Sequence, residues 1–442
     1  MKSESTSTLS TGQARTAVAA KATKKRFVVG FLLFLGIAVN YMDRSNLSLA
    51  APLLGRDLNL SPVQLGLIFS AFGWSYAILQ IPGGMLVDRV KPRVLYAILL
   101  CGWSVATCLQ AAVNGFSTLF GLRVLLGAFE APSYPTNNRV VTTWFPERER
   151  ATAIAFYTSG QFVGIAFFMP LLVYVQATFG WRGMLFFTGA AGVVYSIVWF
   201  IFYRDPKDSK ADAAELDYIR QGGGLVDVGE QGGARKAGWA DFKHVLRNRN
   251  IWGVFIGQFC LSSILWFFLT WFPTYLVKYR GMTTLKMGFM ASVPFLAAYV
   301  GILCSGFLSD FLLRRGFSVG FARKLPVISG LVLATSIVGA NYVQDQTAII
   351  LFMSLAFFGN GMASITWAFV SALAPKSLIG LTGGMFNFMG NLSAIAVPIV
   401  IGVLVKDGHF ESALIFIGAL ALIGALSYVF IVGKIERIVL PE

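Results

Sequence analysis

Twelve apolar stretches divide the sequence, and each is long enough to cross a lipid bilayer as a helix. The hydrocarbon core of a bilayer requires about 20 apolar residues per helix. The chain is also 56% hydrophobic and only 13% charged, which is too apolar for a soluble enzyme of 442 residues. We therefore predict an all-α polytopic membrane protein. The expected spans cover residues 27–50, 62–86, 93–112, 116–137, 151–175, 182–203, 250–275, 284–309, 324–342, 347–372, 378–404 and 411–433.

One long polar insertion, residues 204–249, separates the sixth expected span from the seventh. It divides the twelve helices evenly, which predicts two pseudo-symmetric six-helix bundles. The expected parts are a cytoplasmic tail at 1–24, an N-terminal bundle at 25–203, a cytoplasmic linker at 204–249 and a C-terminal bundle at 250–437.

Lys and Arg crowd the connections on the side of the N-terminus, which places both termini in the cytoplasm by the positive-inside rule. In a soluble protein a net charge of +15 would suggest nucleic acid. Here the bilayer explains where the charges lie, so no nucleic-acid partner is expected. The tail lacks an apolar core and a cleavage site, so no signal peptide is evident. The opposite side carries only Arg56, Lys278, Arg280, Lys286 and Lys406.

The residue types of metal, cofactor and hydrolytic sites lack the required spacing in this chain. The cysteines fall inside apolar runs without paired spacing, and the two histidines lie in polar connections. The glycines of the linker lack the Lys-Ser/Thr ending of a phosphate-binding loop. We therefore expect no enzyme activity, no catalytic residue, no metal and no cofactor. The residues considered are Cys101, Cys108, Cys260, Cys304, His244 and His409.

A short motif occurs after the second and the eighth expected spans. In both copies a glycine stands four residues before an aspartate, and arginines follow in a tight connection. A carboxylate that faces arginines and a helix N-terminus can form a cytoplasmic latch that holds one conformation closed. The alternative is an ordinary charged turn, but the presence of two copies of the motif argues against it. The latch candidates are Gly84, Asp88, Arg89, Arg93, Asp310 and Arg314.

The spans, the central linker and the duplicated motif resemble the major facilitator superfamily from about residue 25 to residue 437. The likeness sharpens at NYMDRSNL (40–47), FEAPSYPTNNR (129–139), WFP (144–146) and LWFFLTWFP (265–273). These segments are similar to the anion:cation symporter family. The usual glycine after the Asp-Arg pair of the first motif is Lys91 in this chain, followed by Pro92, so the resemblance does not specify the exact turn there.

The resemblance implies import of a sugar-acid anion with protons by alternating access, in a monomer of the bacterial inner membrane. D-galactonate is the leading substrate, and glucarate or a hexuronate are alternatives. A drug antiporter and a membrane sensor that does not transport are competing hypotheses. Sodium stays open as the coupling ion.

Two acidic residues lie well inside expected spans, Asp43 in the first and Glu130 in the fourth. Ionisable residues inside a membrane are costly and are therefore functional candidates. Because desolvation favours the neutral form of a carboxylate, such a group can carry a proton. Asp43 and Glu130 are the proton-coupling candidates by elimination, and the resemblance implies the same pair. The alternative for Asp43 and Arg44 is a helix cap at the headgroups.

Two arginines accompany these acids. Arg123 precedes Glu130 by two helical turns, and Arg44 follows Asp43 directly. A guanidinium keeps its charge in proteins. We therefore expect Arg44 and Arg123 to pair with Asp43 and Glu130 in the empty protein, and with a substrate carboxylate in the loaded one. The alternative is a pair of structural salt bridges between the first and fourth helices.

Polar and aromatic side chains in the spans could bind the hydroxyl groups of a sugar acid. A single Ser or Thr in a membrane helix more often bonds a neighbouring helix or its own backbone. The resemblance nevertheless implies a set of substrate-binding residues. They are Tyr41, Arg44, Tyr76, Arg123, Gln161, Ser364, Thr366, Trp367 and Asn387.

Overall fold

The computed structural model describes residues 23–226, 243, 246–375 and 379–438. Within these residues every regular element is helical, which confirms the all-α prediction. The α-helices are α1 (Lys25–Asp57), α2 (Pro62–Arg89), α3 (Pro92–Gln110), α4 (Phe116–Glu130), α5 (Ser133–Trp144), α6 (Glu147–Phe202), α7 (Ala213–Gln221), α9 (Arg249–Thr270), α10 (Phe272–Thr274), α11 (Thr284–Arg314), α12 (Val319–Ala334), α13 (Gln346–Ala363), α14 (Trp367–Leu373), α15 (Ile379–Leu404) and α16 (Glu411–Leu426). The 3₁₀ helices are η1 (Pro206–Asp208), η3 (Thr335–Asn341) and η4 (Ser364–Thr366). The π-helices are η2 (Tyr275–Tyr279) and η6 (Ser427–Ile431).

Ten helices among the described residues are long and apolar enough to span a membrane. The other two expected spans are present in a different form. α4 and α5 together make the fourth span, which breaks after Glu130 because Pro132 lacks a backbone donor. α6 contains the fifth and sixth spans, joined at Gly180, whose φ of 70° and ψ of 177° are not helical. Split in this way, the helices correspond to the twelve expected spans.

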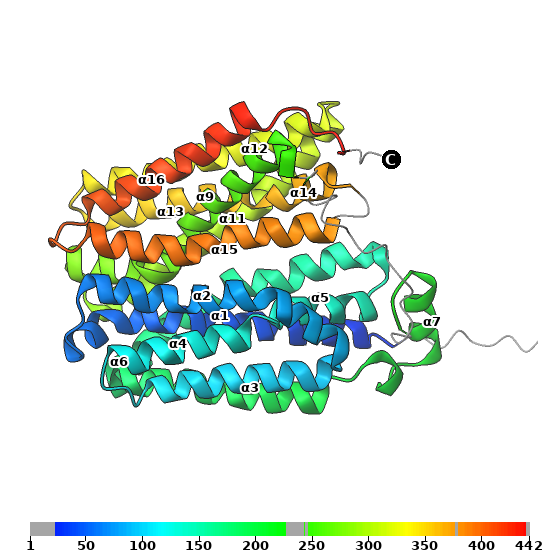
Figure 1. Ribbon diagram of the computed structural model, residues 1–442, viewed down its shortest axis with the longest axis horizontal. Coiled ribbons are helices and arrows are strands. Elements are labelled where there is room, and N and C mark those ends of the chain that lie inside the picture. The colour runs from blue at the N-terminus through cyan, green and yellow to red at the C-terminus, as the bar shows by residue number, and fades with distance from the viewer. Residues whose placement is uncertain (1–22, 227–242, 244–245, 376–378, 439–442) are drawn as a thin grey trace, which may run out of the picture.

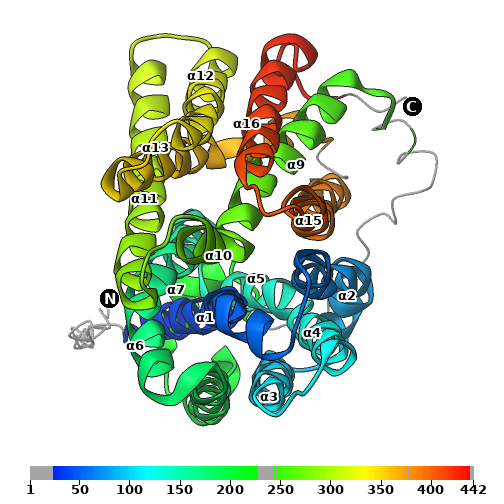
Figure 2. The same cartoon turned by 90° about the vertical axis from the view of Figure 1, so that its left-hand side faces the viewer.

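The long helices form two bundles that lie one above the other (Figure 1). α1 to α6 make the first bundle, and α9 to α16 make the second. The view along the helices separates the same two groups (Figure 2). The bundles meet through α2 against α15 and through α6 against α11. A site between the bundles is therefore bordered by these four helices.

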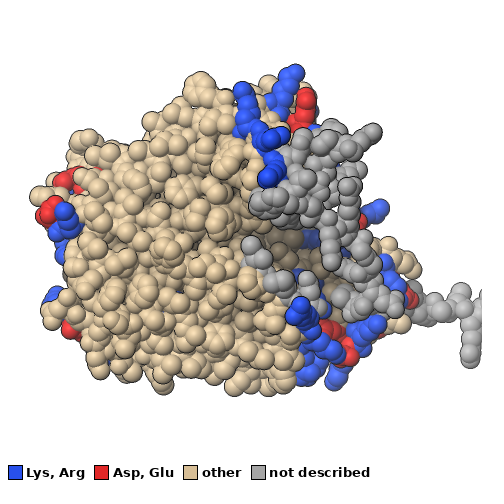
Figure 3. Space-filling view, in the orientation of Figure 1, with Lys and Arg blue, Asp and Glu red and all other residues tan. Residues whose placement is uncertain are grey.

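The two ends of the molecule differ in charge. We call the end that carries Lys25 and α7 the linker end, and the end that carries Asp57 and Thr284 the far end. Figure 3 shows Lys and Arg gathered at the linker end, with a broad uncharged belt between the ends. Large exposed hydrophobic side chains such as Phe167, Ile197 and Phe307 belong to this belt. An apolar belt between two polar ends matches the profile of a bilayer.

The bundles touch tightly at the far end. A Cβ atom added at Gly66 of α2 would lie 2.5 Å from the carbonyl oxygen of Pro398 in α15. One added at Gly402 of α15 would lie 2.7 Å from the carbonyl oxygen of Pro62. Towards the linker end the helices diverge, and Gly84 and Gly384 have no atom within 4 Å of an added Cβ. The structure is therefore closed between the bundles at the far end.

The helix α7 holds the start of α1. Glu215 of α7 is 0% exposed and accepts hydrogen bonds from the backbone N–H groups of Lys25 at 3.0 Å and Arg26 at 3.1 Å. The first N–H groups of a helix lack partners within the helix, and the positive end of its dipole favours an anion there. Arg26 also pairs with Glu149 of α6 at 2.9 Å. The first part of the linker is thus packed onto the first bundle.

Replacing Gly66 by Ala should open the far end. The added methyl group collides with the backbone of α15, and overpacking of this kind costs about 1–3 kcal/mol. In a cysteine-free background, spin labels at Arg56→Cys and Lys406→Cys report the separation of the bundles at this end by double electron–electron resonance. We expect Gly66→Ala to add a longer distance component.

Gly121→Ala in α4 is the control, because an added Cβ there meets no atom within 4 Å and Gly121 is not a latch candidate. It should leave the distance distribution unchanged. An unchanged distribution in Gly66→Ala would show that the contact between α2 and α15 does not hold the far end closed.

Candidate functional site

The candidate site begins with a buried ion pair between two helices of the first bundle. Nε of Arg44 in α1 donates to Oε1 of Glu130, the last residue of α4, at 2.7 Å. The two side chains are 5% and 1% exposed. A charge-assisted hydrogen bond of this length is among the stronger ones in proteins. The pair fixes the middle of α1 to the point where α4 ends.

Aromatic rings surround the guanidinium of Arg44. Its Cζ lies 4.8 Å from the ring centroid of Tyr41 and 4.9 Å from the centroids of Phe72 and Tyr76. The hydroxyl groups of Tyr41 and Tyr134 lie 3.5 Å apart on the same side. Aromatic faces attract a guanidinium and exclude water from it. Arg44 is therefore held in place while part of its hydrogen-bonding capacity stays unused.

Asp43 points away from this pair into the interior of the first bundle. Successive residues of an α-helix project about 100° apart, so Asp43 and Arg44 cannot face the same neighbours. Oδ1 of Asp43 accepts a hydrogen bond from Asn46 at 3.3 Å, and Asn46 also donates to Thr188 of α6 at 3.0 Å. Oδ2 lies 3.8 Å from the position of an added Cβ at Gly192. Asp43 thus lies near α6.

Arg123 of α4 is 2% exposed and lies over the ring of Phe72, with 5.7 Å between its Cζ and the centroid. Among the described residues no carboxylate oxygen lies within 4.0 Å of its guanidinium, and its Nε and Nη1 have no hydrogen-bond partner. The expected pairing of both arginines therefore holds only for Arg44 with Glu130. Asp43 and Arg123 do not form a direct ion pair, because Asp43 faces Asn46.

Several buried polar atoms of this cluster lack a partner within the described part of the chain. They are Nη2 of Arg44, Oε2 of Glu130, and Nε and Nη1 of Arg123. A buried polar group without a partner costs free energy, and a charged one costs more. Donors of two guanidinium groups and an oxygen of Glu130 are thus available to a ligand with a carboxylate and hydroxyl groups.

The second bundle contributes neutral polar groups. Oγ1 of Thr366 donates to Oε1 of Gln258 at 3.1 Å, and Nε2 of Gln258 donates to Ser262 at 3.3 Å. Ser364 is half-buried in η4, the tight turn that ends with Thr366. Trp367 is exposed, and its ring packs edge-on against Phe386 with 4.9 Å between centroids. These groups can donate and accept hydrogen bonds with a ligand without adding charge to the site.

A polar contact joins the two bundles near the middle. Nδ2 of Asn387 in α15 donates to Oε1 of Gln80 in α2 at 3.4 Å. Both side chains are half-buried. Gln161 of α6 is also half-buried. Asn387 therefore belongs to the interface between the bundles and not to the core of either one.

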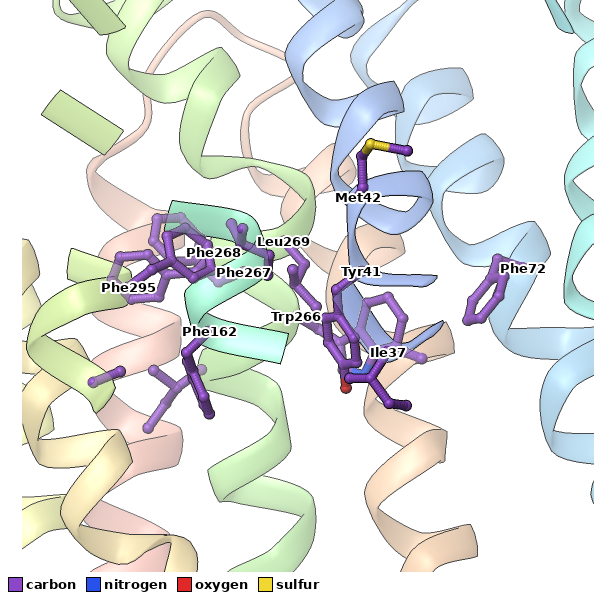
Figure 4. Close-up of a cluster of buried hydrophobic side chains, with 14 of the residues drawn as sticks. Ile37, Tyr41, Met42, Phe72, Phe162, Trp266, Phe267, Phe268, Leu269 and Phe295 are labelled. Atoms are coloured by element: carbon purple, nitrogen blue, oxygen red, sulfur yellow. The ribbon is translucent and has the colours of Figure 1, made fainter. Parts of the chain in front are cut away.

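Buried aromatic side chains from both bundles gather around α1, α2 and α9 (Figure 4). The rings of Phe72 and Trp266 have centroids 5.8 Å apart, which brings α2 against α9. Trp271 packs edge-on against Phe69 at 5.6 Å and donates its indole N–H to the carbonyl of Pro398 at 3.1 Å. These contacts join α2 to the end of α9 and to α15.

The latch candidates lie at the linker end, and those whose side chains the structure describes form no ion pair with each other. Arg89, Asp310 and Arg314 are exposed, and within the described residues none of them forms an ion pair. Arg93 donates from Nε to the carbonyl of Phe200 at 3.0 Å instead of facing α2. The backbone of Asp88 belongs to α2, but its side chain lies outside the described part of the structure.

Sequence reasoning did not single out Gln80, Gln258, Asn46, Thr188 or Tyr134 as site residues. Glutamine inside an apolar span was the available signal for Gln80 and Gln258. Asn46 stands one helical turn after Asp43, which was a signal for a contact between them. Nothing in the sequence pointed to Thr188, because its contact with Asn46 spans 142 positions.

The arrangement suits reversible binding of an organic anion. Within the described chain no group of three or more His, Cys, Asp or Glu residues could hold a metal ion. The buried groups are two guanidiniums, two carboxylates, phenols and amides, which bind by charge and hydrogen bonds. The site lies between bundles that are closed at one end, as binding to one side at a time requires.

Known transporters resemble this chain over nearly its whole length. The D-galactonate transporter of Escherichia coli O6:H1 (strain CFT073) is 51% identical over 423 residues, which cover 95% of this chain and 98% of that protein. A probable galactarate/D-glucarate transporter of Bacillus subtilis (strain 168) is 43% identical over 434 residues, covering 96% and 95%.

A solved structure of a bacterial homologue of the human lysosomal transporter Spinster, in an inward-facing and occupied conformation, aligns with a TM-score of 0.74. The two chains share 17% sequence identity, and the alignment covers 92% of this chain and 97% of the other. The likeness is therefore one of fold.

The family model for the Major Facilitator Superfamily matches residues 33–398. Together with relatives at 51% and 43% identity over nearly the whole length, this match shows that the chain belongs to the Major Facilitator Superfamily and is a transporter, not an enzyme.

Proposed function

We propose that this protein imports a sugar-acid anion, with D-galactonate as the leading substrate, together with protons by alternating access. The proposal is carried by the buried donors of Arg44 and Arg123 that have no partner among the described residues, next to the ion pair of Arg44 with Glu130. Two guanidiniums in a water-poor site favour an anion and disfavour a cation. This argues against a transporter of cationic drugs.

The neighbouring neutral groups support a hydroxylated substrate. Thr366, Gln258 and Asn387 offer donors and acceptors, and Trp367 offers an aromatic face. Pockets of this kind use a few placed polar groups to select among related ligands. The names of the relatives point to D-galactonate first, and glucarate or a hexuronate are the alternatives.

Proton coupling follows from the balance of charge. When Asp43 and Glu130 are both ionised, their two negative charges balance the two positive charges of Arg44 and Arg123, so the cluster sums to zero. A bound carboxylate adds one negative charge that the membrane interior disfavours. When the substrate competes with Glu130 for Arg44, protonation of a released acid restores neutrality. Substrate and proton then cross together.

Asp43 and Glu130 have different parts in this proposal. Glu130 senses the substrate directly, because it shares Arg44 with the incoming carboxylate. Asp43 faces Asn46 and α6 instead, and it acts through the charge balance of the cluster. Sodium is the alternative coupling ion, and the two isolated carboxylates favour protons.

The proposed setting is the bacterial inner membrane, with both termini in the cytoplasm and the protein acting as a monomer. The linker end then faces the cytoplasm, and the structure represents the conformation closed to the outside. The latch around Asp88, Arg89 and Asp310 would form in the opposite conformation, when the bundles approach each other at the linker end.

Uptake into proteoliposomes tests the coupling. D-galactonate uptake by the unmodified protein should rise with an inward proton gradient, while Asp43→Asn and Glu130→Gln should abolish the gradient-driven component. Counterflow of labelled substrate should survive in at least one variant, because exchange needs no net proton movement. Asp407→Asn, an exposed carboxylate at the far end, is the control and should behave like the unmodified protein.

Uptake that ignores the proton gradient and survives both substitutions would refute proton coupling by these acids. Transport of glucarate or a hexuronate without D-galactonate would keep the mechanism and change the substrate. Binding of D-galactonate without flux by the unmodified protein would favour the sensor hypothesis.

The two arginines should respond differently to substitution by glutamine. Arg44→Gln leaves Glu130 buried without its partner, which costs about 3–5 kcal/mol and should lower the melting temperature clearly. Arg123→Gln removes no ion pair, so it should lower the melting temperature much less. Both should weaken D-galactonate binding by roughly 10- to 150-fold, as expected for one hydrogen bond to a charged group.

Calorimetric binding and thermal unfolding measured on the same samples separate these effects. The double variant Arg44→Gln/Glu130→Gln serves as the matched control for stability, since it removes both members of the pair. It should recover much of the melting temperature without recovering binding. Unchanged binding in Arg123→Gln would exclude Arg123 from the substrate site.

A further inference from the structure

A groove lies on the outer surface of the first bundle, away from the candidate site. It has a volume of about 270 Å³ and runs between α3 and the second half of α6. Figure 1 shows these helices along the lower edge of the molecule. Val94, Ile98, Ile197 and Phe200 line it with apolar surface, and all four are exposed. The hydroxyl of Ser196 is already bonded to the carbonyl of Ala97 at 2.9 Å, so the groove offers hydrocarbon contact.

Two arginines converge at the linker end of this groove. Nε of Arg93 donates to the carbonyl oxygen of Phe200 at 3.0 Å, and Nη1 of Arg204 donates to the same oxygen at 2.9 Å. The two nitrogen atoms are therefore no more than 5.9 Å apart, the sum of 3.0 and 2.9 Å. Arg93 also lies over the Phe200 ring at 4.3 Å. Like charges held this close repel each other, and a bound anion would relieve that repulsion.

No described carboxylate supplies that anion. Neither Arg93 nor Arg204 has a carboxylate oxygen within 4.0 Å in the part of the chain that the structure describes. Asp208 pairs with Lys91 at 3.5 Å, and Asp205 accepts from the hydroxyl of Tyr203 at 3.1 Å. The first turn of α3 contains no acidic residue, so its positive dipole end adds to the same field.

The place of this charge in the fold selects the ligand. α3 begins at Pro92 and α6 ends at Phe202, which is where the apolar belt meets the polar linker end. A ligand there meets hydrocarbon-binding surface on one side and two guanidiniums on the other. Phospholipids combine both features, and basic residues at this depth favour anionic headgroups.

We propose that the groove between α3 and α6 binds an anionic phospholipid, with an acyl chain along Val94, Ile98 and Phe200 and the phosphate at Arg93 and Arg204. The site uses no residue of the substrate cluster, and its test needs no transport measurement. It also gives Arg93 a different contact from the one expected of a latch.

Native mass spectrometry of the full chain, with defined lipids added in detergent, tests the site. Phosphatidylglycerol should bind more tightly than phosphatidylcholine. Each of Arg93→Gln and Arg204→Gln should weaken phosphatidylglycerol binding about fivefold, from about 1 kcal/mol per basic residue near a lipid headgroup. Arg315→Gln is the matched control: Arg315 lies over the ring of Phe311 at 4.9 Å on the second bundle, and its loss should change nothing.

Cys101→Phe provides a test independent of the arginines. The larger ring fills the groove and should reduce phosphatidylglycerol binding while both guanidiniums stay in place. Glycerol 3-phosphate, which has the headgroup charge without acyl chains, should not compete. Melting temperatures of all variants in lipid-free detergent check folding, and the rise caused by phosphatidylglycerol should shrink in the Arg93, Arg204 and Cys101 variants alone.

Three results would overturn the proposal. Equal binding of phosphatidylcholine would remove the preference for an anionic lipid. Competition by glycerol 3-phosphate, with no effect of Cys101→Phe, would reduce the site to one for a free anion. Binding that survives Arg93→Gln/Arg204→Gln would place the lipid elsewhere.

Discussion

The ion pair between Arg44 and Glu130 is the constraint on which the centre of the molecule depends. Both groups are nearly inaccessible to solvent at 2.7 Å from each other, in a chain whose surroundings are hydrocarbon. Removing either partner would leave the other charge buried alone, at a cost of about 3–5 kcal/mol. The rings around Arg44 and the interruption of the helix after Glu130 are arranged around this pair. Any ligand that enters must either leave the ion pair intact or replace one of its two members.

The two bundles divide the chemistry between them. Within the described residues, the buried charges at the centre belong to α1 and α4, while α9, η4 and α15 face them with amides, hydroxyls and rings. Both bundles are therefore helical, but they do not share a set of buried charges at the centre. A binding site of this kind can keep its charge balance in one bundle and vary its selectivity in the other.

The sequence predicted the helices well because length and hydrophobicity identify each span. It also led to Asp43, Glu130, Arg44 and Arg123, because charges inside apolar runs are rare. It did not predict their pairing, which depends on how α4 is rotated against α1. It also missed the contact of Gln80 with Asn387, since 307 positions separate them. Composition reveals the charged residues whose burial in a membrane costs free energy, whereas packing determines which partners they contact.

The contact of Glu215 with the start of α1 has a consequence for biosynthesis. The carboxylate that caps the first N–H groups of α1 lies 190 positions further along the chain. A ribosome therefore makes every helix of the first bundle before this cap exists. Until then the opening turn of α1 has no side chain from its own N-cap residue to satisfy it. Completion of the first bundle is thus tied to emergence of α7, before the second bundle is translated.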